Sequence, residues 1–127
     1  MEQTFVDFVA LARVQTETRA YRAGDIIFKA GDLARELYLI KEGSVSVSIG
    51  THHVATLGEG EIFGEMALVG RQSRSANAIA RTDCVLIPVT EKQFLIMVRA
   101  APNFAIAIMR TMAQRLRNVE QSQGEVN

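Results

Sequence analysis

The sequence predicts a mainly β domain, a β-roll or jelly roll, with one helix before it and two helices after it. Glycines recur at short intervals between positions 24 and 70 and divide the middle of the chain into short apolar runs. Such spacing indicates many short antiparallel strands. Apolar residues at helical spacing precede this region, and a helix-capping sequence with a second apolar-periodic stretch follows it.

The first helix is expected at residues 1–15, where apolar side chains fall on one helical face. The residues on that face are Phe5, Phe8, Val9 and Ala12. The β-roll is expected at residues 16–89. Within it, the segment 45–49 alternates apolar residues with serines, as in a half-buried strand. The segment 49–52 is expected to be a hairpin tip, and the last strands are expected at 75–80 and 85–89.

The C-terminal region, residues 90–123, is expected to hold two helices. The run TEKQ at 90–93 is a capping box that begins the first of them. This helix should end before Pro102, because proline disfavours helical backbone in the preceding residue and suits the first turn of a new helix. The second helix should end near residue 121, before Gly124.

Composition indicates one globular domain. The chain has 127 residues, of which 48% are hydrophobic and 22% charged, with a formal net charge of zero. Nothing in this balance favours nucleic acid or an anionic membrane as a partner. We expect no signal peptide and no membrane span, and therefore a soluble protein. The single cysteine, Cys84, lies in an apolar run, so we expect a buried thiol and a reducing cytoplasmic location.

The functional signal lies between Gly58 and Ala76, in GEGEIFGEMALVGRQSRSA. Glu65 follows a glycine turn at the start of a very short predicted helix, and Arg74 comes nine residues later. A helix start and an arginine fork both suit a phosphate, and a carboxylate can accept a hydrogen bond from a sugar hydroxyl. A ribose 3′,5′-cyclic phosphate carries both groups.

The pattern FGEMAL…RSA at residues 63–76 resembles the phosphate-binding cassette of the cyclic nucleotide-binding domain family. That family includes catabolite-activator-type regulators, the regulatory subunits of cyclic-nucleotide-dependent kinases and cyclic-nucleotide-gated channels. The spacing from Glu65 to Arg74 matches the kinase and channel versions. Residues 21–47 resemble the first strands of the family, so the resemblance covers nearly all of 1–127 and implies the β-roll fold.

The resemblance implies a role for each cassette residue. Glu65 would hold the ribose 2′-hydroxyl and Arg74 the phosphate, while main-chain N–H groups of Gly64, Ala67 and Ser75 would face the ligand. Met66 and Ala76 complete the cassette set. The Ser75 hydroxyl permits both cyclic AMP and cyclic GMP, and the resemblance to bacterial members favours cyclic AMP. Ser73 replaces the proline of many relatives, which should leave the loop less preorganised.

The resemblance also implies a pocket for the purine. Val47, Ala55 and Leu57 would form its wall, and Arg115 and Val119 on the final helix would close over the base as a lid. The alternative for Val47 and Leu57 is a place in the ordinary core of the barrel. The alternative for Arg115 is a solvated helix arginine.

Three other interpretations remain open. The chain could be the sensor portion of a longer transcription regulator or cyclic-nucleotide-gated channel, or a scaffold of this fold that binds no ligand. A homodimer through the last helix is the third, because apolar residues there repeat by four and three; they are Ala105, Met109, Met112, Leu116 and Val119. We expect no enzyme, no cofactor and no metal, since the histidine pair at 52–53 is a poor metal site alone.

Overall fold

The computed structural model describes residues 17–65 and 73–126, with the backbone alone for Phe104 and for 118–126. The strands are β1 (Arg19–Tyr21), β2 (Ile26–Phe28), β3 (Glu36–Glu42), β4 (Val45–Ile49), β5 (His52–Leu57), β6 (Ile62–Phe63), β7 (Asn77–Ala80) and β8 (Cys84–Thr90), and the helices are α3 (Glu91–Ala100) and α4 (Pro102–Val126). The predicted fold class is confirmed for this part of the chain. The expected helix at 1–15 lies outside the described residues.

The strands form two four-stranded antiparallel sheets, in the orders β1-β8-β3-β6 and β2-β7-β4-β5. Strands that are distant in sequence lie side by side in both sheets, as they must in a roll. The predicted hairpin tip is present, since Gly50 and Thr51 join β4 to β5. The alternation expected in β4 holds only at its start: Val45 is buried and Ser46 half-buried, but Val47 and Ser48 are both half-buried and Ile49 is 54% exposed.

The two central strands, β3 and β8, are buried on both faces. In β3, Leu37 and Leu39 pack with the helices, while Tyr38 and Ile40 point between the sheets. The two faces of β8 are buried in the same way, one against the helices and the other between the sheets. Double-sided burial explains why both strands are nearly continuous apolar runs, whereas a strand with one wet face alternates.

A second core fills the space between the two sheets. Phe28, Tyr38 and Phe63 form an aromatic group there, with ring centroids 5.3 to 6.3 Å apart. Cys84 belongs to the same core, as its sequence context predicted, and burial raises the pKa of its thiol. This aromatic group lies on the side of the roll that carries the candidate site described below.

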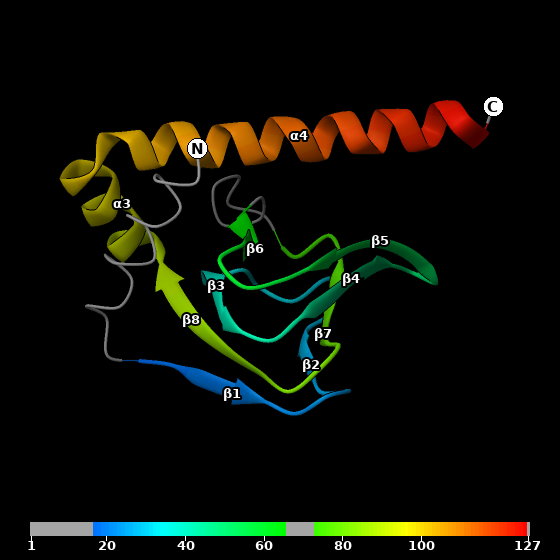
Figure 1. Ribbon diagram of the computed structural model, residues 1–127, viewed down its shortest axis with the longest axis horizontal. Coiled ribbons are helices and arrows are strands. Elements are labelled where there is room, and N and C mark those ends of the chain that lie inside the picture. Colours follow the sequence, from blue (N-terminus) through cyan, green and yellow to red (C-terminus); the bar gives the residue numbers. More distant parts are fainter. Residues whose placement is uncertain (1–16, 66–72, 127) are drawn as a thin grey trace.

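The helices begin where the sequence predicts. Thr90 and Gln93 form the expected capping box, and α4 starts at Pro102. α4 extends to Val126 and passes through Gly124, so the predicted end near residue 121 was wrong. A glycine inside a helix costs only about 1 kcal/mol relative to alanine and need not end it. Figure 1 shows α4 lying along one side of the roll, with α3 leading to it from the end of β8. Among the described residues no single helix is long and apolar enough to cross a membrane, and residues 91–100 with 105–117 pass that test only as a bent pair.

One glycine position is expected to control stability. Gly43 has φ +94°, and a Cβ added there would lie 2.4 Å from the Asp83 carbonyl oxygen and 2.6 Å from the Cys84 Cβ. Gly31 has nearly the same φ, +95°, but open space around it. We therefore expect Gly43→Ala to lower the free energy of unfolding by about 2–5 kcal/mol, from backbone strain and overpacking together. Gly31→Ala should cost only the strain, about 1–2 kcal/mol. Urea unfolding of both variants measures the difference, and equal losses would contradict this account.

Candidate functional site

Arg74 immediately precedes the turn into β7, and only 5% of it is exposed. Its Nη1 donates to the Gly64 carbonyl oxygen at 2.8 Å, and its Nη2 donates to the main-chain oxygen of Glu36. The guanidinium carbon lies 4.2 Å from the centre of the Phe28 ring. Two carbonyls and one aromatic face thus fix the orientation of this side chain.

The charge of Arg74 has no carboxylate in contact with it among the described residues. Burial lowers the pKa of the guanidinium, although nearby groups such as Tyr38 and Glu36 act in the opposite direction. Its Nε is buried and has no hydrogen-bond partner there. An uncompensated buried cation is costly, and an anion would relieve that cost. The position therefore suits an anionic ligand.

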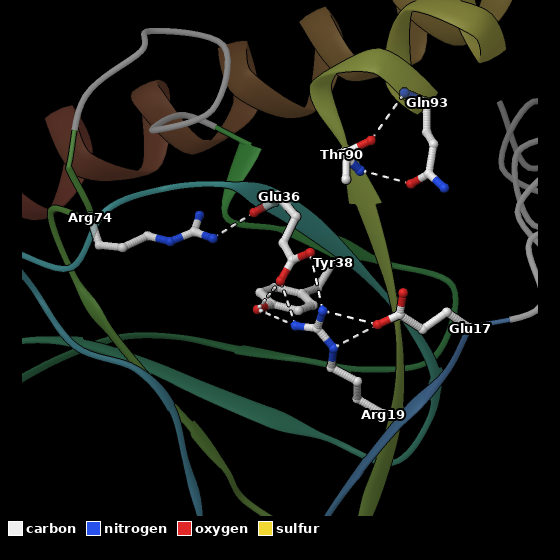
Figure 2. A network of polar contacts seen from close by, with 7 residues as sticks. All are labelled: Glu17, Arg19, Glu36, Tyr38, Arg74, Thr90 and Gln93. Carbon is white, nitrogen blue, oxygen red and sulfur yellow. Dashed lines mark hydrogen bonds and ion pairs between the residues drawn. The ribbon is translucent and has the colours of Figure 1, made fainter.

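Glu36 is held in place from the opposite side by a polar network that Figure 2 shows. Its carboxylate accepts hydrogen bonds from Arg19 and, at 3.1 Å, from the Tyr38 hydroxyl. Burial, and then the neighbouring Glu36 carboxylate, raise the pKa of Tyr38, so its hydroxyl stays protonated and can donate. Arg19 also pairs with Glu17 at 2.9 Å. The network fixes the start of β3, where the Glu36 carbonyl oxygen accepts the hydrogen bond from Arg74.

Glu65 is fully buried, at 0% exposure, and it is the second residue after β6. Its Oε1 accepts a hydrogen bond from Nη1 of Arg115 on α4. The second nitrogen of the same guanidinium, Nη2, donates to the Ile62 carbonyl oxygen. Within the described part of the chain, Oε2 of Glu65 is buried and has no partner. One carboxylate oxygen is therefore open to a further donor.

Gly64 brings the acid and the arginine together. It has φ +81°, and a Cβ at this position would lie 2.7 Å from Nη1 of Arg74. The position therefore needs glycine both for its backbone conformation and for the close approach of Arg74. Gly64 directly precedes Glu65, and its carbonyl oxygen accepts a hydrogen bond from Arg74. The cationic and the anionic side chain of the site are therefore both positioned by this one glycine.

A groove of about 1140 Å³ lies between α4 and strands β5 and β6. Ala55 and Leu57 line it from β5, and Thr111 and Arg115 line it from α4. Val47 instead packs against the core between the sheets, half-buried. Arg74 and Glu65 are absent from the lining, so the groove adjoins the buried charges through Arg115 and does not enclose them.

The structure brings together only part of the predicted site. Ser75 is exposed and Ala76 is half-buried next to Arg74. Met66 and Ala67 lie outside the described residues. The side chain of Val119 does too, although its backbone belongs to α4.

Several contacts escaped prediction. The Glu36 and Ile62 carbonyls have no sequence signal, since every residue carries a carbonyl. The aromatic platform, Phe28, had a weak signal as a bulky residue between two predicted turns. The pairing of Arg115 with Glu65 joins positions fifty residues apart, and no pattern in a single sequence indicates it.

The histidine pair at the start of β5 has an ordinary role at position 53. The two ring nitrogens of His53 lie 3.2 Å from Ser46 Oγ and 3.1 Å from Thr56 Oγ1. The contact with Ser46 joins β5 to β4, whereas the contact with Thr56 lies within β5. No group of three or more His, Cys, Asp or Glu side chains in the described ranges could hold a metal ion.

Comparison with known proteins gives one family. A family model described as "Cyclic nucleotide-binding domain" matches residues 18–100. The cyclic AMP receptor protein of Thermus thermophilus is 36% identical over 118 residues, which cover 88% of this chain and 54% of that protein. A cyclic nucleotide-gated potassium channel of Rhizobium etli is 35% identical over 97 residues, which cover 76% of this chain and 27% of the channel.

A solved structure agrees with these relatives. The crystal structure of Thermus thermophilus catabolite activator protein superposes with a TM-score of 0.80 at 33% identity, covering 93% of this chain and 58% of that one. The chain spans well under two thirds of each of these proteins. The matched residues include β1 to β8, α3 and the buried pair Glu65 and Arg74. The chain belongs to the cyclic nucleotide-binding domain family.

Proposed function

We propose that this chain is a sensor module for a purine 3′,5′-cyclic nucleotide and not an enzyme. One observation carries the proposal: a buried cation and a buried carboxylate flank Gly64, and each has a polar atom without a partner among the described residues. A ligand that presents an anion and a hydroxyl side by side would satisfy both. Arg74 would take the cyclic phosphate, and Glu65 would take the ribose 2′-hydroxyl.

The remaining predicted contacts fit around this pair. Gly64, Ala67 and Ser75 would offer main-chain N–H groups, with Met66 and Ala76 beside them. The purine would enter the groove between β5 and α4, against Ala55 and Leu57, with Val47 behind them and Arg115 and Val119 on the helix side. Because the ligand would contact both the roll and α4, its binding would favour the arrangement in which they are closest.

We propose cyclic AMP ahead of cyclic GMP. The support is the name of a relative, the cyclic AMP receptor protein, which matches 88% of this chain. Ser75 is exposed next to Arg74, so its hydroxyl is available to a phosphate or to a guanine amino group and permits either nucleotide. We propose a cytoplasmic location, which suits a buried free thiol such as Cys84.

We also propose that this module is part of a longer regulator or channel, because the chain covers only 54% and 27% of two such relatives.

The exposed apolar side chains of α4 favour a homodimer in addition. Met109 is 60% exposed and Leu116 is 61% exposed on that helix. Exposed apolar residues that recur along one helix commonly mark an association surface. We do not propose direct contact with nucleic acid, since the chain carries no net positive charge.

A panel of three nucleotides tests the proposed function. We expect cyclic AMP and cyclic GMP to raise the melting temperature, and 5′-AMP to leave it unchanged because its phosphate is not joined to the 3′ oxygen. A ligand at about one hundred times its Kd stabilises the folded state by about 2.7 kcal/mol. Thermal-shift measurement, followed by calorimetry for Kd, gives the answer. No shift with either cyclic nucleotide would favour the scaffold interpretation and overturn the proposal.

A further inference from the structure

Arg115 makes two contacts that no other described residue of α4 makes. Its guanidinium donates to Oε1 of Glu65 through Nη1 and to the Ile62 carbonyl oxygen through Nη2. The side chain of Arg115 is 30% exposed, while the carboxylate that it reaches is fully buried. Arg115 therefore extends from the groove surface into the interior, and it ties the middle of α4 to the turn after β6.

The buried Glu65 carboxylate depends on this contact. An ionised carboxylate without water needs a positive partner and hydrogen bonds, or its burial is strongly unfavourable. Within the described residues, Arg115 supplies the one ion pair to Glu65. Arg74 interacts electrostatically with Glu65, but its hydrogen bonds go to the Gly64 and Glu36 carbonyl oxygens and not to the Glu65 carboxylate. Arg115 and Arg74 thus have separate tasks.

The contact with Arg115 also gives the two carboxylate oxygens of Glu65 different environments. Oε1 is occupied by Arg115, and Oε2 is buried without a partner among the described residues. The hydrogen bond to Oε1 and the full burial of the side chain together restrict the orientation of the carboxylate. The open oxygen is then preorganised for a donor from a ligand, and no side-chain ordering remains to be done when that ligand binds.

We propose that Arg115, besides lining the groove, is a positioning residue for ribose recognition, which acts on the sugar through Glu65. This inference rests on the proposed function, in which Glu65 reads the 2′-hydroxyl. The position of α4 and the recognition of the sugar are then coupled, because the Arg115 guanidinium belongs to α4 and holds the carboxylate that binds the 2′-hydroxyl. A lid arginine that lies over the base would act differently, since its loss would weaken ribose and 2′-deoxyribose nucleotides in equal proportion.

The test compares cyclic AMP with 2′-deoxy cyclic AMP by calorimetry. The wild-type protein should prefer cyclic AMP by about 10- to 150-fold, the range for a hydrogen bond to a charged group. In Arg115→Ala this preference should fall to about threefold or less, because the carboxylate loses its anchor. Arg115→Lys keeps a charge for Glu65 and should retain most of the preference. Arg99→Ala is the control, since Arg99 is an exposed arginine of α3 that does not line the groove.

The outcomes separate the inference from the proposed function. A wild-type protein that binds neither nucleotide overturns both. A wild-type protein that binds, with an Arg115→Ala variant that keeps the full preference for the 2′-hydroxyl, overturns the inference alone. Unfolding without ligand reports whether each variant folds. If the alanine variant does not, Arg115→Gln decides the matter, because it keeps a donor for the Ile62 carbonyl, removes the charge and should show the same fall in preference.

Discussion

Arg74→Ala is expected to weaken cyclic nucleotide binding by about 2–5 kcal/mol, a loss of roughly 30-fold to several thousand-fold in Kd. The reason is the environment of the guanidinium. It is 5% exposed, it is oriented by the Gly64 and Glu36 carbonyls, and it has no carboxylate in contact within the described ranges. A phosphate that binds there would meet a cation already fixed in direction and largely free of water, where electrostatic attraction is strongest.

The same substitution should affect folding less than binding. Alanine leaves the Gly64 and Glu36 carbonyls without their donor, which costs about 1–3 kcal/mol for each group that water cannot reach. It also removes a cation that burial disfavours, as the lowered pKa of Arg74 indicates. These two effects oppose each other. Denaturant unfolding without nucleotide measures their sum, and the binding loss should be read after that correction.

Two further variants sharpen the experiment. Arg74→Lys keeps the charge but cannot fill two carbonyls and reach a phosphate with one compact ammonium, so it should fall between wild type and alanine. Arg81→Ala removes an exposed arginine from the turn after β7 and should leave Kd unchanged. Calorimetry of the four proteins with cyclic AMP provides the comparison. Equal affinities for wild type and Arg74→Ala would remove Arg74 from the phosphate site.

The fold was largely predictable because its signals are local. Glycines with positive φ mark the turns, among them Gly43 and Gly64, and the capping box at Thr90 begins α3. Each of these features depends on neighbours in sequence. The end of α4 was not predictable, because Gly124 is a poor stop signal once a long helix is already formed.

The candidate site was predictable only in its charges. Glu65 and Arg74 stand in a recognisable spacing, and the structure buries both near Gly64. Their hydrogen bonds were not predictable, since Arg74 is held by main-chain oxygens and Glu65 by an arginine fifty residues away. Such contacts follow from packing α4 against the roll, and single-sequence patterns report packing partners only as apolar faces.

Removing the acid should abolish the preference for a ribose hydroxyl. We expect Glu65→Ala to bind cyclic AMP and 2′-deoxy cyclic AMP with equal affinity, and to bind cyclic AMP about 1.5–3 kcal/mol more weakly than wild type. The physical reason is that the buried, unpartnered Oε2 is the acceptor that the 2′-hydroxyl would use. Affinity for the 2′-deoxy nucleotide should change far less, which separates loss of one acceptor from general damage to the site.

Glu65→Gln is the closer test, because it keeps the shape and one acceptor oxygen but removes the charge that Arg115 neutralises. It should retain part of the preference for cyclic AMP over its 2′-deoxy analogue. If Arg115 acts through Glu65, the double variant Arg115→Ala with Glu65→Ala should lose little more preference than either single variant, with a coupling of about 0.5–3 kcal/mol. Additive losses would show two independent contacts with the ligand. In that case Glu65 would read the sugar without help from α4.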